Sequence, residues 1–361
     1  MRYILQNVLF YKKNWKRYRE NGGVFMDIKD IAKLSQVSVS TVSRVINNHP
    51  DVKYETRERI LEVIKQTNYI PNNSARILKK NNDKSIGILV KGVYNPFFSE
   101  MVKIMSDKIK QANYTMILQY YDQKSKEDVN ALITFIKEKK LQGVICLGGD
   151  FTDISDDNFK GLDVSVVLTS VTNISKTAFN KFSSIGIEDE KSAYKATEYL
   201  IKNGHRTILL IIGSYEDIGA GKLRVDGYRQ ALNNYGLCYD EELVAIGDYS
   251  FDKAYNATID ILKNRKDITA IFAISDIMAI GAAKAVINSG YRIGDDISIM
   301  GFDGMEMGKY YNPSITTIYQ PKTKMANMSV ELLLSLMNKK GKNKHITLDT
   351  KLVEGESCKP I

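Results

Sequence analysis

A cluster of small hydroxyl side chains and one arginine lies between Ser38 and Arg44, in the segment SVSTVSR. Short Ser and Thr side chains let a helix approach the major groove of DNA closely, and an arginine can pair with the O6 and N7 atoms of guanine. Apolar residues Val42, Val45 and Ile46 would lie on the opposite side of such a helix. The spacing therefore predicts a helix with one face that reads DNA bases. The alternative is a small helical bundle in which these side chains only contact solvent.

Two further helices are expected to position this one. Asp27 is a suitable N-cap for a helix with apolar residues at helical spacing from Ile28 to Leu34, and Ser38 can cap the next helix, Val39–Ile46. A third amphipathic helix is predicted over Thr56–Thr67, with Ile60, Leu61 and Ile64 facing inward. Two short helices joined by a tight turn, with a third behind them, form the helix-turn-helix plan.

The distribution of charge along the chain supports a nucleic-acid-binding head. The 361 residues carry 51 Lys and Arg against 42 Asp and Glu, a formal net charge of +9. Residues 1–84 hold 17 basic and 8 acidic residues, so residues 85–361 hold 34 of each and are neutral. A small basic module joined to a large neutral one indicates a polyanion-binding head on a body with another task.

Composition excludes several classes of protein. The hydrophobic fraction of 43% and the charged fraction of 26% are typical of a soluble globular chain, and no apolar run is long enough to span a bilayer. Cys146, Cys238 and Cys358 are far apart and odd in number, which indicates neither a disulfide framework nor a metal site and favours a reducing cytoplasm.

Residues 1–25 are expected to be a non-native or disordered N-terminal extension. Their apolar stretch precedes the basic aromatic run from Tyr11 to Arg19, which is the reverse of the order in a signal peptide. One interpretation is a basic arm that adds phosphate contacts. The favoured hypothesis is that translation starts at Met26, since Gly22-Gly23-Val24 can be encoded by a purine-rich ribosome-binding sequence.

The run IKDIAKLSQVSVSTVSRVINN resembles the head of the lactose/galactose repressor (LacI) family of transcriptional regulators. By this resemblance Val39, Ser40 and Arg44 occupy base-reading positions, and Val39 is suited to contact a thymine methyl group. The following segment, YIPNNSARILKK, resembles the family's hinge helix, in which Leu78 would enter a base step of a palindromic operator bound by a homodimer. The residues expected to contact DNA are Ile28, Ser38, Val39, Ser40, Thr41, Ser43, Arg44, Asn47, Asn73, Ala75, Leu78 and Lys79.

After Lys84, short β-type runs alternate with helical stretches. This alternation predicts βαβ units and parallel sheets, and its division into two series indicates two lobes with a cleft between them. Strands are expected at 85–90, 114–121, 143–148, 164–169, 183–187, 207–213, 243–247, 270–274 and 297–303. Helices are expected at Phe97–Gln111, Ser125–Lys139, Glu188–Asn203, Lys222–Tyr235, Phe251–Lys263 and Asp276–Ser289.

The fold class predicted for the whole chain is an all-α helix-turn-helix head with a hinge helix, joined to a two-lobed α/β domain like the periplasmic binding proteins. The expected parts are a DNA-binding domain at 26–72, a hinge at 73–84 and an effector-binding and dimerisation domain at 85–361. The resemblance implies discontinuous lobes, one of about 85–187 with 319–346 and one of about 188–318 with 347–361.

Residues at strand ends are the candidates for binding a small-molecule effector, because ligands of open α/β sheets bind beyond the carboxyl ends of the strands. Phe97 and Phe98 match the family's aromatic position, where a ring can stack. Arg224, in KLRVDGY, can bind hydroxyl groups or a carboxylate. The full set of candidates is Phe97, Phe98, Arg224, Tyr249, Ser275, Asp276 and Asp303.

The sequence has no recognisable catalytic or metal-binding pattern. His49, His205 and His345 are dispersed, and none has a metal-ligand spacing or a partner nucleophile. We therefore expect a cytoplasmic, non-enzymatic regulator without a cofactor or metal, whose partners are double-stranded operator DNA, a second copy of the chain and an effector, expected to be a sugar. The alternatives are a sugar-binding receptor without DNA function and a sugar-modifying enzyme with a DNA-binding appendage.

Overall fold

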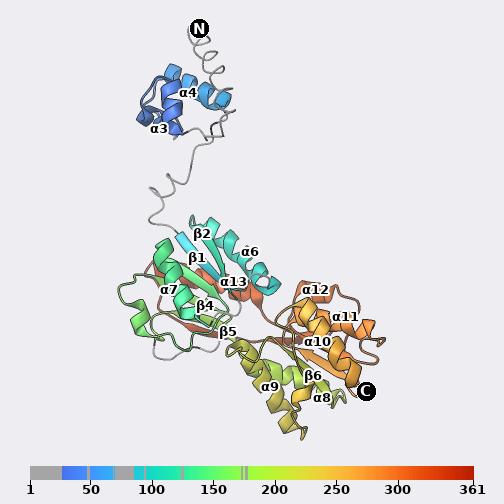
Figure 1. Cartoon of the computed structure of the whole chain (residues 1–361). Helices are drawn as coiled ribbons and strands as arrows, with labels where there is room; N and C mark the ends of the chain where they lie inside the picture. The colour runs from blue at the N-terminus through green and yellow to red at the C-terminus, as the bar shows by residue number, and fades with distance from the viewer. Residues whose placement is uncertain are drawn as a thin grey trace. The chain divides into compact units, whose positions relative to one another are not determined.

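The structure is a computed structural model that describes residues 27–46, 49–67, 69, 85–92, 95–122, 126–171, 174 and 178–361. The chain divides into two compact units, Met1–Asn82 and Asp83–Ile361 (Figure 1). We call them the head and the body. No helix among the described residues is long and apolar enough to cross a membrane.

The head is built from three helices around a small apolar core. They are α2 (Ile28–Leu34), α3 (Val39–Ile46) and α4 (Tyr54–Thr67). Asp27 caps α2 as predicted, because its carboxylate accepts hydrogen bonds from the Lys29 and Asp30 amides. Ser38 Oγ likewise accepts a hydrogen bond from the Thr41 amide at the start of α3. The buried apolar core residues are Ile31, Ala32, Val42, Val45, Ile60 and Val63.

The third helix differs from its prediction in extent and orientation. It begins at Tyr54 rather than Thr56, and it buries Ile60 and Val63, while the predicted core residue Leu61 is 44% exposed. The sequence offers two overlapping apolar stripes, and the packing against α2 and α3 selects the one that contains Val63.

The first lobe of the body is a parallel six-stranded sheet in the order β11-β5-β4-β3-β1-β2. Its strands are β1 (Ser85–Lys91), β2 (Thr115–Tyr121), β3 (Gly143–Leu147), β4 (Ser165–Thr169), β5 (Ser183–Ile187) and β11 (His345–Leu348). Its helices are α6 (Pro96–Gln111), α7 (Asp128–Lys139), the short η1 (Asp156–Phe159) and α13 (Lys322–Met337). Helix α7 begins three residues later than the predicted Ser125.

The second lobe is another six-stranded sheet, in the order β12-β10-β9-β8-β6-β7, and only β12 is antiparallel to its neighbour. Its strands are β6 (Ile208–Ile212), β7 (Val244–Ile246), β8 (Ala270–Ala273), β9 (Ser298–Asp303), β10 (Thr316–Tyr319) and β12 (Lys351–Val353). Its helices are α8 (Asp189–Lys202), α9 (Ala220–Asn234), η2 (Glu241–Leu243), α10 (Phe251–Asn264), α11 (Asp276–Asn288) and α12 (Glu306–Lys309).

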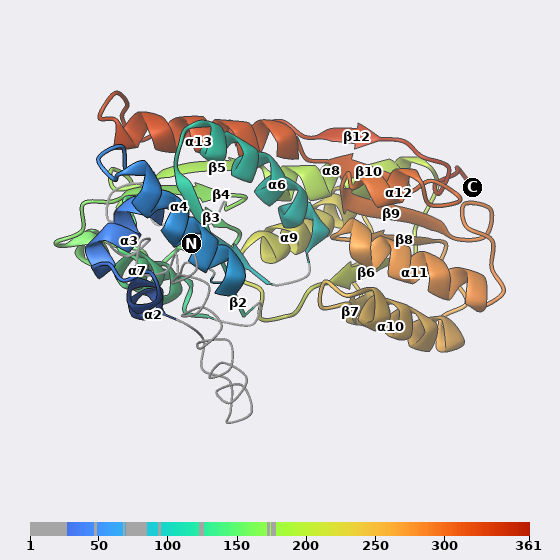
Figure 2. The same cartoon turned by 90° about the horizontal axis from the view of Figure 1, so that it is seen from above.

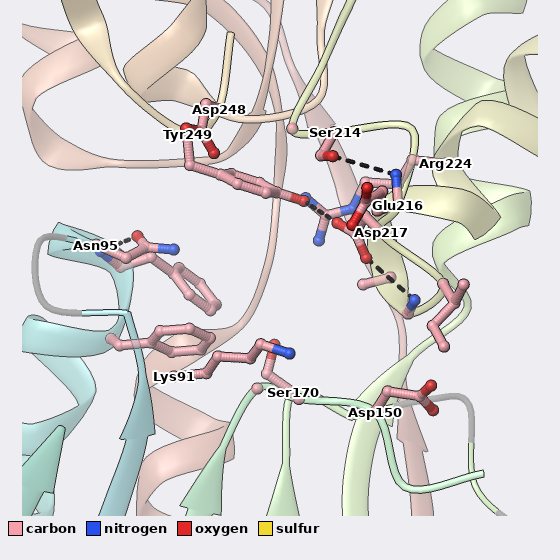
Figure 3. Close-up of a pocket in the computed structure, with 18 of the residues that line it drawn as sticks. Lys91, Asn95, Asp150, Ser170, Ser214, Glu216, Asp217, Arg224, Asp248 and Tyr249 are labelled. Carbon is pink, nitrogen blue, oxygen red and sulfur yellow. Dashed lines mark hydrogen bonds between the residues drawn. The ribbon is translucent and has the colours of Figure 1, made fainter. Parts of the chain in front are cut away.

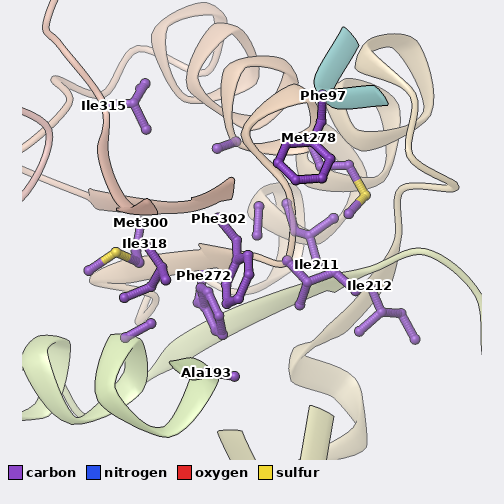
Figure 4. Packing of buried hydrophobic residues seen from close by; sticks show 14 of the residues in the cluster. Phe97, Ala193, Ile211, Ile212, Phe272, Met278, Met300, Phe302, Ile315 and Ile318 are labelled. Carbon is purple, nitrogen blue, oxygen red and sulfur yellow. The ribbon is translucent and has the colours of Figure 1, made fainter. Parts of the chain in front are cut away.

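The chain passes between the lobes three times: from β5 to α8, from β10 to α13 and from β11 to β12. The lobes lie side by side (Figure 2). One apolar cluster includes residues of both, so Phe97 of α6 belongs to the same buried cluster as Met278 and Phe302 of the second lobe (Figure 4). The predicted helix-turn-helix head and two-lobed α/β body are confirmed, while the predicted hinge helix lies outside the described residues. The elements β10, α13, β11 and β12 are ones that the alternating pattern did not reveal.

Helices α8 and α9 approach so closely that Gly227 has no room for a side chain. A Cβ atom there would lie 2.1 Å from the Glu190 carbonyl oxygen and 2.8 Å from the Tyr194 amide nitrogen, and both are backbone atoms of α8. Any side chain at position 227 must therefore push the two helices apart.

We predict that Gly227→Ala lowers the free energy of unfolding by about 1–3 kcal/mol, because overpacking outweighs the better helix propensity of alanine. Urea denaturation of the full chain measures the loss. Gly308→Ala is the matched control, since a Cβ at this helical glycine would meet nothing closer than 3.6 Å. Equal stability of the two variants would contradict the close approach of α8 and α9.

Candidate functional site

Helix α3 of the head presents the predicted recognition face to solvent. Val39 is 41% exposed, Ser40 is exposed, and the Arg44 side chain is 59% exposed, whereas Val42 and Val45 are buried in the head core. The exposed face therefore presents one apolar side chain, one hydroxyl group and one cation to a ligand.

The other predicted DNA-contacting residues of the head are less exposed or engaged within it. The Ser38 and Thr41 hydroxyls lie 2.9 Å apart and hydrogen-bond each other, while Thr41 and Ser43 are half-buried. Ile28 packs against the head core. The remaining predicted contacts lie outside the described residues; they are Asn47, Asn73, Ala75, Leu78 and Lys79.

Arg44 forms a salt bridge with Asp51 at 3.0 Å, but both side chains are about half exposed. Exposed pairs of this kind contribute about 0–1 kcal/mol and exchange readily with other partners. The guanidinium group therefore remains available to an anionic or hydrogen-bonding ligand.

A pocket of about 450 Å³ lies between the two lobes of the body (Figure 3). The first lobe contributes residues that end or follow β1, β3 and β4, and the second contributes residues that end or follow β6, β7 and β9. All six strands are parallel within their sheets, so their carboxyl ends meet at this cleft. The pocket therefore lies where ligands of open α/β sheets bind, beyond the carboxyl ends of the strands. Five of the predicted effector residues line it: Phe97, Phe98, Arg224, Tyr249 and Asp303.

Arg224, on α9, lies at the second-lobe side of the pocket and is only 6% exposed. Its Nε donates to Asp189 Oδ1 at 2.9 Å, and Nη1 donates to the Ile274 carbonyl oxygen at 2.7 Å. Its guanidinium carbon lies 3.7 Å from the centre of the Phe302 ring. Although burial alone lowers the pKa of this arginine, its two carboxylate neighbours raise it, so the group stays charged.

Asp303 connects Arg224 to the second crossing between the lobes. Its Oδ1 lies 3.7 Å from Arg224 Nη1 and accepts a 2.7 Å hydrogen bond from Gln320 Nε2. The backbone of Asp303 has φ = 119°, a conformation that residues with a side chain seldom adopt. Such strain is retained where surrounding contacts fix it, often at ligand sites.

Tyr249 follows β7, and its side chain points towards Asp217 (Figure 3). Its hydroxyl donates to Asp217 Oδ2 at 2.7 Å. Burial and the nearby Asp217 carboxylate raise the pKa of Tyr249, so the phenol stays protonated and remains a donor. The Asp217 carboxylate also accepts from the Gly219 amide at 3.0 Å, which fixes the loop after β6.

The first-lobe wall combines aromatic rings with a buried ion pair. Asn95 caps α6 and Pro96 starts it, which places Phe97 and Phe98 at the pocket with ring centres 5.5 Å apart. At the end of β1, Lys91 Nζ donates to Asp128 Oδ2 at 2.8 Å. The same oxygen accepts from the Asp150 amide at 2.7 Å, so Asp128 holds both the lysine and the loop after β3.

Two predicted effector residues, Ser275 and Asp276, do not line the pocket. Both follow β8, but Asp276 is fully buried and turns into the lobe. Its carboxylate accepts hydrogen bonds from the Met305 amide and the Thr317 hydroxyl, both at 2.6 Å. Ser275 caps α11 by accepting from the Met278 amide. These residues organise the turn after β9 instead of facing a ligand.

Sequence reasoning missed several polar residues of the site, namely Lys91, Asp128, Asp150, Asp217 and Gln320. The rule that ligands bind at strand ends could have found Lys91, Asp150 and Asp217, since each ends or follows a predicted strand. Asp128 starts a helix, and no local signal marks it or Gln320. Among the described residues, no group of three or more His, Cys, Asp or Glu side chains could hold a metal ion.

The fold and the two sites define a class of protein: a helix-turn-helix head with an exposed reading face, attached to a two-lobed binding domain. Residues 27–72 match the model for bacterial regulatory proteins of the lacI family, and residues 197–358 match a periplasmic binding protein-like domain. The HTH-type transcriptional regulator MalR of Clostridium butyricum is 58% identical over 92% of this chain and 99% of its own length. The chain therefore belongs to the lacI family and is a DNA-binding transcriptional regulator, as predicted.

The chain is also similar to a more distant relative and to two solved structures. Catabolite control protein A of Priestia megaterium is 31% identical over 91% of this chain and 95% of its own. A transcriptional regulator CelR–cellobiose complex is 26% identical with a TM-score of 0.65, and a lac repressor dimer bound to operator and the anti-inducer ONPF is 25% identical with a TM-score of 0.63. Both structures cover 92% of this chain, and the chain covers 99% of each.

We predict that the body becomes more stable as the pH falls from neutral towards mildly acidic values. Burial raises the pKa values of Asp276 and Asp303 above the ordinary 3.8. Between the unfolded and the raised folded values the folded state binds more protons, so stability is lost as pH rises through the folded pKa. Asp276→Asn should flatten this dependence, measured as the urea midpoint against pH, whereas exposed Asp260→Asn should not. If the profile of Asp276→Asn equals that of the wild type, the raised pKa of Asp276 does not contribute to the pH dependence.

Proposed function

We propose that this regulator is a homodimer that binds a palindromic operator through α3 and the hinge at 73–84, under the control of a neutral sugar bound between the lobes. The division into head, hinge and body, and the residues assigned to each ligand, are part of this proposal. A role in the cytoplasm follows from the location of bacterial operator DNA. A binding role, rather than a catalytic one, fits relatives that are named as regulators.

The pairing of charges in the pocket is the observation that supports a neutral effector. The mostly buried cation Lys91 is paired with Asp128 at 2.8 Å. Lys253 is paired with Asp248, and Arg224 is held by Asp189 and Asp303. A sugar phosphate or a free carboxylate would therefore have to displace an existing partner, whereas hydroxyl groups can use the remaining hydrogen-bonding capacity of these same groups.

The shape of the pocket supports a sugar-sized ligand. Its volume of about 450 Å³ falls within the roughly 300–1,000 Å³ typical of small-molecule sites. Phe98 and Tyr249 offer apolar faces, and the carboxylates of Asp150 and Asp217 accept hydrogen bonds. The CelR structure is a complex with cellobiose, a sugar without charge.

A thermal-shift screen of the full chain tests the proposal against neutral mono- and disaccharides, sugar phosphates and purines. We expect stabilisation by a neutral sugar and a change in DNA affinity when that sugar is present. Stabilisation only by a phosphorylated sugar or a purine would refute the neutral-sugar assignment, and sugar turnover would favour the alternative of an enzyme.

Phe98→Ala should weaken binding of that sugar by about 10-fold, because a ring contact contributes about 0.5–1.5 kcal/mol beyond its buried area. Titration calorimetry measures the change, and DNA binding without sugar should stay as in the wild type. Phe179→Ala, which removes a half-exposed ring of the same lobe away from the pocket, is the control. We prefer Phe98 to Arg224, since loss of Arg224 would remove the cation that pairs with buried Asp189 and Asp303 and destabilise the body.

Arg44→Ala should weaken operator binding by about 1–3 kcal/mol if the guanidinium reads a guanine, without lowering the melting temperature of the head. The operator can be recovered by selection from random duplexes and the affinity measured by mobility shift. Arg59→Ala removes an equal charge from the exposed surface of α4 and serves as the control. Equal losses for the two variants would mean that Arg44 contributes only charge and does not read a base.

A further inference from the structure

The edge of the first lobe opposite the pocket collects lysines from segments far apart in the sequence. The pocket lies at the carboxyl ends of the parallel strands, so the segments that lead into these strands meet at the other edge. Three of these segments supply exposed lysines: the one before β3, the one before β5 and the one between α13 and β11. We call this set the basic edge; it consists of Lys140, Lys181, Lys339, Lys340, Lys342 and Lys344.

Backbone contacts hold the three segments together. The Ser184 amide donates to the Lys344 carbonyl oxygen at 2.9 Å, which joins the segment before β11 to β5. Asn343 Nδ2 donates to the Asn180 carbonyl oxygen at 2.6 Å. At the other end of the loop, Met337 lies so close to Gly143, the first residue of β3, that a Cβ on that glycine would be 2.5 Å from Met337 Sδ. The lysines therefore share one surface.

The lysines of the basic edge lack acidic partners. Within the described part of the chain, none of the six forms a salt bridge. In the second lobe, by contrast, Lys191, Lys202 and Lys263 are each paired with a carboxylate one helical turn away. The body as a whole is neutral, with 34 basic and 34 acidic residues after position 84. Its charge is therefore segregated, and like charges held together without partners repel one another.

The head is joined to the body at this same edge. Strand β1 starts at Ser85, and its register places Ile86 beside Gly143 at the start of β3. Residues 70–84 form the whole connection from Tyr69 to Ser85, and a connection of that length spans at most about 55 Å even when fully extended. The chain that leads from the head therefore enters the body at the edge that carries these lysines.

We propose that the basic edge is a second DNA-contacting surface, which binds phosphates of the duplex held by the head. DNA is the polyanion that this chain binds, and unpaired lysines bind phosphate groups without reading sequence. The contact adds affinity that is sensitive to salt and independent of sequence. The basic edge lies on the body and not on the head, so the proposal goes beyond DNA recognition by α3. It also does not depend on whether the effector is a sugar.

The test is the triple variant Lys339→Gln/Lys340→Gln/Lys342→Gln of the full chain, bound to a random-sequence duplex over a range of salt concentrations. Each lost phosphate contact lowers the slope of log K against log salt by about 0.9, so we expect a decrease of about 1–3 in the slope. At low salt the affinity should fall by about 3- to 30-fold. A random duplex removes any dependence on the identity of the operator.

The matched control is Lys195→Gln/Lys263→Gln/Lys351→Gln, which removes the same charge from exposed positions of the second lobe. The proposal requires the first variant to lose more affinity and more slope than the control. Equal behaviour of the two variants would overturn it, since only net charge would then matter. An unchanged slope would also overturn it, since it would show that these lysines make no phosphate contacts.

Discussion

The placement of one buried guanidinium group organises the second lobe and its side of the pocket. A charged group removed from water is tolerated only with close partners, and removal of one partner typically costs about 3–5 kcal/mol. Arg224 therefore fixes where Asp189, Asp303 and the Ile274 carbonyl group must lie. These partners belong to the start of α8, the end of β9 and the end of β8. One side chain thus sets the relative positions of four elements before any ligand arrives, which is the preorganisation that selective binding needs.

The same network continues into the segment that joins the lobes. Asp303 accepts a hydrogen bond from Gln320, at the crossing from β10 to α13, and Lys322 donates to the Gly304 carbonyl oxygen at 3.1 Å while it pairs with Glu100 of α6 at 2.8 Å. A ligand that contacts Asp303 or Gln320 therefore acts on a segment shared by both lobes. Under the proposed function, this is the physical route by which effector binding and the angle between the lobes are linked. Linkage of this kind is reciprocal, so DNA binding would change effector affinity by the same factor.

Much of the fold could be predicted because its signals are local. The caps at Asp27 and Ser38 and the alternation of strands and helices depend on neighbouring residues only. The strand-end rule led to Asp303, but it also led to Asp276, which turns inward and accepts hydrogen bonds from the Met305 amide and the Thr317 hydroxyl. Whether a polar residue at a strand end faces the cleft or the core depends on such tertiary partners. Asp189 could not be predicted as the partner of Arg224 for the same reason, because it lies 35 residues away in the sequence. Tertiary packing also decides that Val63 is buried in α4 and that the predicted core residue Leu61 is not.

The pairing of lysines distinguishes the two kinds of ligand proposed for this chain. Lys91, at the pocket, is fixed by Asp128, which cancels its net charge and leaves it a directional donor suited to a hydroxyl group. Lys339 and Lys342, at the opposite edge of the same lobe, are exposed and have no acidic partner among the described residues. A free ammonium group suits a phosphate backbone, whose charge is high and whose exact position varies. Residue type alone does not distinguish these roles, because the distinction depends on whether the fold supplies a carboxylate within reach of each ammonium group.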